Sequence, residues 1–438
     1  MDLSISRLGD AKIRSPLNLS THLGDSVCNF VPDDRRVLYD VSLESCKACV
    51  REGHGEFPLS FEKAGPRELI YFDPSKVRVG VVTCGGLCPG TNNVIRALVM
   101  ELHYHYAVGH IYGFQYGYAG LNPEAAHDVI DLTPKAVKDI HHDGGSFLGS
   151  SRGHQDAAVM VDTLERMGVG VLFTIGGDGT LRGALEIHKE VQRRGLKIAV
   201  IGIPKTIDND ILLVEKTFGF ETAFSIAIQA IRAAHVEAEG APNGIGLVQL
   251  MGRHSGYIAA NAALAEPDVN CVLIPEVPFP LDGPRGLFAW LKERLQSRGH
   301  AVIVVAEGAG REFFNPDDRK YDASGNVDLE DIGLFLKRRI ATEMRDQGIV
   351  HSLKYIDPSY IIRSAPANPN DSLFCATLAQ NAAHAGMSGR TGMLVGLWHN
   401  VFTHVPIDLA VAGRKLVDPE GELWRTVVES TGQPFTWS

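Results

Sequence analysis

The chain of 438 residues has no apolar run that approaches the roughly 20 residues of a membrane-spanning helix. Its start, Met-Asp-Leu-Ser, lacks the basic and then apolar pattern of a secretory signal, and its end, Phe-Thr-Trp-Ser, matches no targeting tripeptide. Internal repeats and low-complexity runs are also absent. We therefore expect a globular protein with no membrane partner.

Cysteine is scarce. Seven cysteines, an odd number in a chain of this length, favour reduced thiols and a cytoplasmic location. Cys46 and Cys49 have C-x-x-C spacing, but no second Cys/His pair follows at zinc-ribbon distance, and no βαβ pattern surrounds them. A redox or metal role for this pair is therefore the less favoured interpretation.

Positive charge is outnumbered, with 42 Lys and Arg against 52 Asp and Glu, which gives a net charge of −10. This balance argues against a mainly electrostatic grip on nucleic acid or anionic lipid. Any anionic substrate must instead be held by local basic clusters.

The length predicts two domains. Residues 1–75 are polar, irregular and interrupted by five prolines, so we interpret them as an N-terminal extension that wraps a folded body. From Lys76 onward, apolar strand patterns alternate with helix patterns, and a domain change is expected near residues 215–225. Strands are predicted at 77–83, 170–175, 198–203, 246–250, 270–274 and 302–306. Helices are predicted at 92–106, 180–194, 221–239, 255–265, 284–298 and 330–347. This alternation predicts parallel sheets with helices on both faces and ligands at the carboxyl ends of the strands.

Two loops present small residues where a phosphate could bind. Residues 83–93 join a strand to a helix through three glycines, and a side-chain-free turn at a helix N-terminus leaves N–H groups to face an anion. This loop, which contains Gly85, fits neither the dinucleotide nor the P-loop motif, and alone it reads as a structural turn. Arg152 and Gly153 lie in a second such loop, where Arg152 alone reads as a surface arginine.

The segment Gly176-Gly177-Asp178-Gly179-Thr180 follows a strand and gives a stronger signal. Asp178 can cap the next helix, but capping does not require two preceding glycines. Bare backbone beside one carboxylate is typical of a phosphate and divalent-metal site.

Residues 206–210, Thr-Ile-Asp-Asn-Asp, offer a candidate base after the next strand. Asp208 and Asp210 cannot both be buried without partners, so one is expected to face a cation or a substrate proton. Lys205 is placed to neutralise phosphate charge during transfer. The alternative is a polar turn between strand and helix.

Three later elements place basic and acidic side chains at predicted strand ends or in a late loop. Met251, Gly252 and Arg253 follow one strand, Glu307 follows another, and Tyr360-Ile361-Ile362-Arg363 adds a second arginine. Backbone N–H groups and arginines suit a sugar phosphate, and a carboxylate suits sugar hydroxyls.

In this order, these motifs resemble the phosphofructokinase family over residues 76–405. The resemblance implies two doubly wound, parallel-sheet (Rossmann-like) α/β domains with an active-site cleft between them, plus the N-terminal extension. Residues 76–220, with about 364–400, would bind ATP and Mg²⁺, and residues 221–363, with about 401–438, would bind fructose 6-phosphate. The implied reaction is phosphorylation of the 1-hydroxyl of fructose 6-phosphate in glycolysis.

On the donor side, the resemblance implies that Gly85, Arg152 and Gly153 meet the phosphates. Gly177, Asp178, Gly179 and Thr180 would line the nucleotide, and Asp178 would hold Mg²⁺.

On the sugar side, the resemblance makes Asp208 the general base, with Thr206, Ile207 and Asp210 around it. The implied sugar-phosphate contacts are Met251, Gly252, Arg253, Glu307, Tyr360 and Arg363. Family members generally assemble, so a homodimer or homotetramer is expected.

The donor depends on two glycines. Pyrophosphate-using relatives usually carry an aspartate and a lysine where this chain has Gly179 and Gly183. A carboxylate at 179 would crowd and repel an α-phosphate, so ATP is implied. Lys205, however, is shared with the pyrophosphate enzymes, a mixture that resembles the trypanosome and plant ATP-dependent branch.

Three alternatives stay open. The first is the same reaction with pyrophosphate as donor. The second is an NAD or lipid kinase, which shares the Gly-Gly-Asp-Gly-Thr turn but lacks the Met-Gly-Arg and Tyr-x-x-Arg elements. The third is a binding paralogue without turnover, which loss of Asp178 or Asp208 would mark, and both are present.

Overall fold

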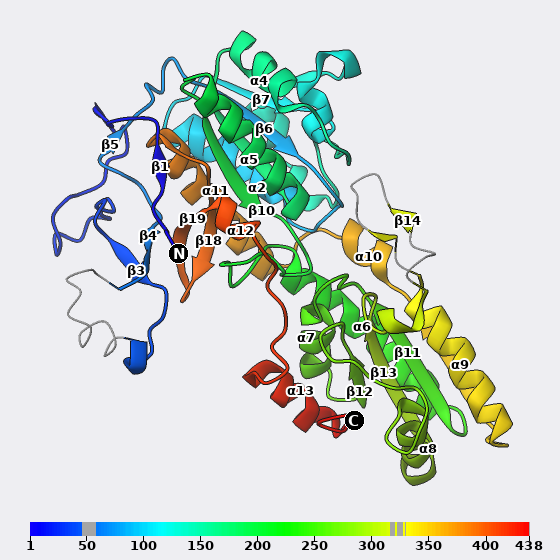
Figure 1. The fold of residues 1–438 in the computed structure, drawn as a ribbon. Helices are drawn as coiled ribbons and strands as arrows, with labels where there is room; N and C mark the ends of the chain where they lie inside the picture. The colour runs from blue at the N-terminus through cyan, green and yellow to red at the C-terminus, as the bar shows by residue number, and fades with distance from the viewer. Residues whose placement is uncertain (46–57, 316–319, 322–326, 329, 438) are drawn as a thin grey trace. The chain divides into compact units, whose positions relative to one another are not determined.

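The computed structural model describes residues 1–45, 58–315, 320–321, 327–328 and 330–437, and these form two compact units (Figure 1). Unit 1 is formed by residues 1–206, 211–219 and 365–414. Unit 2 is formed by residues 207–210, 220–364 and 415–438. The N-terminal extension and residues 401–414 thus belong to unit 1. Cys46 and Cys49 lie outside the described residues.

Unit 1 contains a nine-stranded sheet whose five central strands, β18, β10, β9, β6 and β7, are parallel. Its full order is β3 (Arg36–Leu38), β4 (Ser60–Lys63), β19 (Val401–Pro406), β18 (Met393–Trp398), β10 (Ala199–Pro204), β9 (Val169–Gly176), β6 (Arg78–Thr83), β7 (His110–Phe114) and β8 (Val129–Asp131). The predicted strands at 77–83, 170–175 and 198–203 are confirmed to within one residue at each end.

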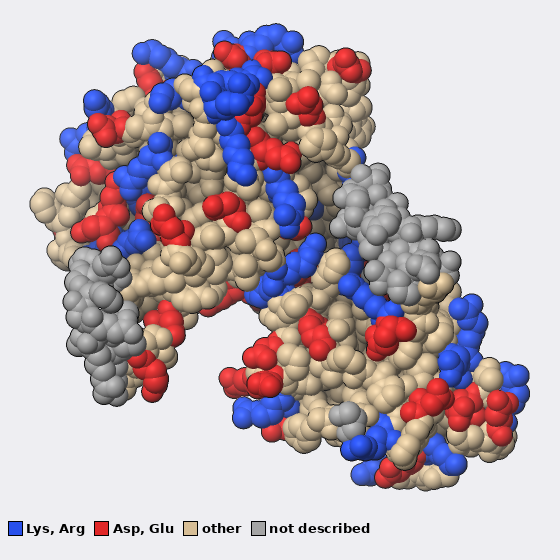
Figure 2. All heavy atoms as spheres, viewed as in Figure 1, with Lys and Arg blue, Asp and Glu red and all other residues tan. Residues whose placement is uncertain are grey.

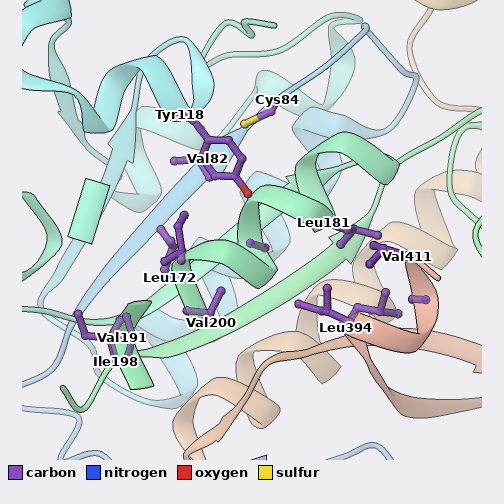
Figure 3. Close-up of a cluster of buried hydrophobic side chains, with 14 of the residues drawn as sticks. Val82, Cys84, Tyr118, Leu172, Leu181, Val191, Ile198, Val200, Leu394 and Val411 are labelled. Atoms are coloured by element: carbon purple, nitrogen blue, oxygen red, sulfur yellow. The ribbon is translucent and has the colours of Figure 1, made fainter. Parts of the chain in front are cut away.

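Helices cover both faces of this sheet. The strand residues Leu172 and Val200 share one buried cluster with Leu181 and Val191 of α5 (Asp178–Arg193), as Figure 3 shows. Val171, which precedes Leu172 in β9, points to the opposite face of the sheet. It packs against α11 (Pro369–Met387), where a Cβ on Gly386 would lie 2.7 Å from Val171 Cγ1. Successive side chains of a strand point to opposite faces of the sheet, so one strand packs against a helix layer on each face. The remaining helices of this unit are α2 (Thr91–Met100), which continues as a π-helix (Glu101–His105), α3 (Pro134–Val137), α4 (Ala157–Arg166) and α12 (Ile407–Ala410).

The N-terminal extension adds strands to unit 1. β4 pairs with β19, β1 (Ser6–Arg7) pairs with β17 (Arg390–Thr391), and β2 (Ile13–Arg14) pairs with β5 (Leu69–Ile70). Glu62 of β4 is buried against Arg67, Arg390 and His404. Burial alone would raise the pKa of Glu62, but the hydrogen bond with His404 and the two arginine charges outweigh it and lower that pKa. The extension is thus tied to the body by strand pairing and by a buried ionic cluster.

Unit 2 is built on four parallel strands in the order β12 (Cys271–Leu273), β13 (His300–Ala306), β11 (Gly244–Leu250) and β16 (Ser352–Ile356). One face packs Leu247 and Ile303 against α8 (Leu287–Arg298) and α9 (Ile332–Asp346). On the other face, Gly246 admits Ala234 of α6 (Phe220–Glu239), because a Cβ there would lie 2.8 Å from the Ala234 oxygen. The other helices are α7 (Tyr257–Ala265), α10 (Ser359–Ser364) and α13 (Glu422–Thr431).

Acidic and basic side chains are interspersed over the face shown in Figure 2, and neither sign dominates it. Within the described residues, no helix has both the length and the apolarity to cross a membrane.

Candidate active site

The carboxyl ends of β6, β9 and β10 bring three predicted loops of unit 1 together. The Lys205 N–H donates to the Gly176 oxygen (3.0 Å), and Lys205 Nζ donates to the Gly86 oxygen (2.5 Å). The Gly85 N–H donates to the Ser151 oxygen (3.0 Å), next to the exposed Arg152. The loops after β6, β9 and β10 thus line one edge, because parallel strands end at the same edge, and the segment of Ser151 and Arg152 joins them as a fourth.

Glycine is required at two of these positions. Gly85 has a φ of +85°, in the left-handed region that side chains disfavour. A Cβ on Gly176 would lie 2.1 Å from Thr180 Oγ1. Gly176 therefore permits the close turn between β9 and α5, and Gly85 permits the left-handed turn after β6.

Asp178 is the first residue of α5, and the capping position is Gly177, which provides no side-chain cap. Asp178 therefore does not cap the helix. Its Oδ2 lies 3.1 Å from Arg182 Nε and 3.4 Å from Arg414 Nη2, and its side chain is 18% exposed. The sequence reasoning did not select either arginine. Arg182 lies one helical turn after Asp178 and was detectable, whereas Arg414 comes from a segment 236 residues away.

Gly179 and Gly183, on the first two turns of the same helix, differ in what surrounds them. A Cβ on Gly179 would have no neighbour within 4 Å, so this glycine leaves open space. A Cβ on Gly183 would lie 2.5 Å from the ring of Tyr118, whose hydroxyl donates to the Thr180 oxygen (2.6 Å). Gly183 therefore has a packing role that the sequence did not reveal.

In unit 2, Asp208 is the centre of a second cluster. Its main-chain oxygen accepts a hydrogen bond from Ser255 Oγ (2.8 Å), and the Arg253 main chain bonds to its carboxylate. Burial raises the pKa of Asp208 to about 7, and the charges of Asp210 and Glu307 act in the same direction. The Arg363 charge opposes them. The residue keeps some solvent access, so its carboxyl group can exchange a proton.

Glu307 follows the last residue of β13, and its N–H donates to the Leu250 oxygen at the end of β11 (2.8 Å). Burial raises its pKa, although Arg363 and Arg253 lower it. Arg363 Nε in turn lies 3.2 Å from Met251 Sδ. The predicted residues of the two strand-end loops, together with Arg363 of α10, therefore surround one polar centre.

These two loops of unit 2 are in backbone contact. The Gly308 N–H donates to the Gly252 oxygen (3.1 Å), and a Cβ on Gly308 would lie 2.1 Å from the Arg253 oxygen. Gly252 itself has a φ of +125°. Only residues without side chains allow this approach, which holds Arg253 beside the glutamate.

One predicted residue lies apart from the cluster, and one unpredicted residue lies near it. The Tyr360 side chain is 85% exposed, although Arg363 is one turn later on the same short helix. Arg311, which the sequence reasoning passed over, bonds to the Arg253 oxygen and His254 and lowers the pKa of Glu307. Its position after a glycine-rich strand end was the available signal.

Two α/β units, each with polar loops at the carboxyl edge of parallel strands, define a class of protein that binds anionic ligands at those edges. The model of the family described as "Phosphofructokinase" matches residues 78–385. The chain is 48% identical to "ATP-dependent 6-phosphofructokinase" of Borreliella burgdorferi, over 100% of this chain and 98% of that protein. It is 43% identical to the protein of the same name from Trypanosoma cruzi, over 98% and 87%. The chain belongs to the phosphofructokinase family.

The fold agrees with solved structures. A crystal structure of pyrophosphate-dependent phosphofructokinase from Marinobacter aquaeolei matches with a TM-score of 0.67 at 19% identity, over 81% of this chain and 91% of that one. The structure of Pichia pastoris phosphofructokinase in the T-state matches with a TM-score of 0.64 at 21% identity, over 85% and 41%. These likenesses confirm the predicted two-domain α/β fold.

Proposed function

We propose that this protein is an ATP-dependent 6-phosphofructokinase, which converts D-fructose 6-phosphate and ATP to fructose 1,6-bisphosphate and ADP. Relatives that match nearly its whole length bear that name. The observation that carries the proposal is the buried cluster around Asp208, where the Arg253 main chain bonds to the carboxylate beside the charges of Glu307 and Arg363, and where burial raises the pKa of Asp208 to about 7. A general base is most efficient when its pKa is near the working pH.

In this reaction, Asp208 accepts the proton of the sugar 1-hydroxyl while that oxygen forms a bond to the γ-phosphorus and the bond to ADP breaks. Thr206, Ile207 and Asp210 position the base. The sugar phosphate is held by charge-assisted hydrogen bonds and main-chain N–H groups from the second cluster. The residues proposed for this are Met251, Gly252, Arg253, Glu307, Tyr360 and Arg363.

The donor is held by the loops at the edge of unit 1. Gly85, Gly177, Gly179 and Thr180 leave backbone accessible to the phosphates, and the start of α5 favours negative charge. Arg152, with Gly153, and Lys205 neutralise charge on the phosphoryl group in transit. Electrostatic stabilisation of this kind is the main protein contribution to phosphoryl transfer.

Magnesium fits at Asp178. Mg²⁺ in such enzymes is usually held by one or two carboxylates, substrate phosphates and water. Asp178 offers a partly exposed carboxylate, and the adjacent Gly179 leaves open space. When bound there with the phosphates, Mg²⁺ would neutralise their charge.

The open space at Gly179 supports ATP as the donor, because an aspartate there would repel an α-phosphate. Gly183 says nothing about the donor, because the Tyr118 ring leaves no room for a side chain at this position whichever donor binds. Pyrophosphate remains the second candidate donor, because pyrophosphate enzymes also carry a lysine at the position of Lys205. This lysine contacts Gly86 in the first glycine-rich loop.

The test compares both donors. Purified protein with fructose 6-phosphate and Mg²⁺ should form fructose 1,6-bisphosphate with ATP and much more slowly with pyrophosphate. Asp208→Asn should lower kcat by about 10²–10⁴, the usual contribution of a general base, while substrate affinity changes little. Asp346→Asn, an exposed aspartate at the end of α9, is the control and should retain activity. Turnover with pyrophosphate alone would refute the donor assignment.

We also propose a homodimer or homotetramer in the cytoplasm. Four buried free cysteines support a reducing compartment: Cys84, Cys88, Cys271 and Cys375. Sedimentation of the purified protein would give the assembly.

A further inference from the structure

A cluster of metal-ligating side chains lies in unit 2 at the opposite end of the strands from Glu307. His235 and Glu239 are one turn apart at the end of α6, and His300 is the first residue of β13. One ligand atom from each of these three lies within 4.8 Å of the others. No step of the proposed phosphoryl transfer uses them.

His235 lies close to two carboxylates. His235 Nε2 lies 3.5 Å from Glu239 Oε2 and 3.7 Å from Asp268 Oδ2. Charged hydrogen bonds are normally about 2.7–2.9 Å, so both gaps are too long for one. Two ligands of one tetrahedral Zn²⁺, with bonds of about 2.0–2.1 Å, are separated by about 3.4 Å. The two gaps from His235 are close to that separation, and the candidate ligand atoms of His235, Glu239 and His300 all lie within 4.8 Å of one another.

The surroundings favour a cation within this cluster. The rings of His235 and His300 pack edge to face with centroids 5.5 Å apart, and two carboxylates lie near His235. The nearby Arg232 is paired with Glu266, and Arg294 donates to the His300 main-chain oxygen. His235 Nδ1 is buried and makes no hydrogen bond to the described residues, so no protein contact fixes the tautomer of the ring.

We propose that His235, Glu239 and His300 bind one Zn²⁺ ion, with Asp268 or water as the fourth ligand. Imidazole and carboxylate donors in this number suit zinc better than the hard cation Mg²⁺. The ion would link the end of α6 to the start of β13. Its role is structural and does not depend on the kinase proposal.

The experiment uses full-length protein stripped with a chelator and titrated with Zn²⁺ in excess Mg²⁺, which occupies carboxylate-only sites. We expect one equivalent to bind and the unfolding temperature to rise by several degrees. Glu239→Gln, at a side chain that is 57% exposed, and His300→Ala should each lower the zinc affinity at least about 100-fold. Glu237→Gln, on the same helix and paired with Lys354, is the matched control and should bind zinc normally.

Co²⁺ provides an independent readout. Binding at the cluster should give the visible absorption of a four-coordinate ion with nitrogen and oxygen ligands, lost in Glu239→Gln. Cobalt–thiolate charge-transfer absorption would instead place the ion at cysteines and overturn the proposal. Failure to bind one equivalent, or equal binding by Glu239→Gln and Glu237→Gln, would also overturn it.

Discussion

Replacement of Asp208 by asparagine should make the protein more stable while it removes activity. The folded-state pKa of about 7 lies about 3 above the ordinary value of 3.8. At 1.36 kcal/mol for each pKa unit, the ionised side chain destabilises the fold by up to about 4 kcal/mol. Because some solvent reaches the side chain, we expect about 2–4 kcal/mol for Asp208→Asn.

The pH dependence has a definite sign. A raised carboxyl pKa means that the unfolded chain ionises first, so the wild-type protein loses stability as the pH rises from about 4 to 7. The advantage of Asp208→Asn is therefore largest above pH 7. It should shrink by up to about 2 kcal/mol between pH 7 and 5.5 and vanish below the unfolded-state pKa.

Calorimetry without ligands at pH 8 and 5.5 measures this effect. The unfolding temperature of Asp208→Asn at pH 8 should exceed that of the wild type by at least about 2 °C, with a smaller difference at pH 5.5. Asp346→Asn should show no difference at either pH. A variant that is less stable at pH 8, or equally stabilised at both pH values, would refute the burial argument. Near-normal turnover would refute the role as base.

The other predictions concern the same two clusters. The Asp210 charge raises the pKa of Asp208, so Asp210→Asn should shift the acid limb of the plot of kcat/KM against pH to below pH 7. An acid limb at the wild-type pH would contradict this. Gly179→Asp should raise the KM for ATP at least about tenfold without lowering the unfolding temperature, because the site is open and a helix N-terminus favours an acid. Gly183→Ala should lower stability by about 1–3 kcal/mol in urea titration, because its Cβ overlaps the Tyr118 ring, whereas unchanged stability would show that the ring moves aside freely.

Much of the fold was predictable because its strands are buried on both faces. Strands such as β9 and β10 are continuous apolar runs that end at glycine or at a polar turn, and the helices between them keep a clear period. The antiparallel strands β19 and β4, which lie toward one end of the same sheet, lack this signal. β4 reads Ser-Phe-Glu-Lys, and its Glu62 is buried only because Arg67 and Arg390 meet it. Side chains whose burial depends on distant partners give no local pattern.

In the candidate site, too, the residues with a local sequence signal were predictable and those that depend on distant contacts were not. Glycines with a positive φ or a close backbone contact, such as Gly85 and Gly252, mark their loops in the sequence. Arg414, which reaches Asp178 from the C-terminal part of unit 1, has no such mark. The exposure of Tyr360 was equally hidden, because helical spacing relates it to Arg363 but does not fix which way either side chain faces.

The segment from Lys205 to Asp210 shows that residues close in sequence can contact different parts of the protein. The chain leaves unit 1 after Thr206, so Lys205 makes its contacts with Gly86 and Gly176, whereas the pKa of Asp208 is raised by burial and by the charges of Asp210 and Glu307, against the charge of Arg363. Asn209, at a φ of +54°, turns the backbone between the two acids. A run that resembles one polar turn therefore supplies Lys205 to the strand-end loops of unit 1 and Asp208 to the polar cluster of unit 2. Substitutions at Lys205 and Asp208 should accordingly act on different substrates, although the residues are three positions apart.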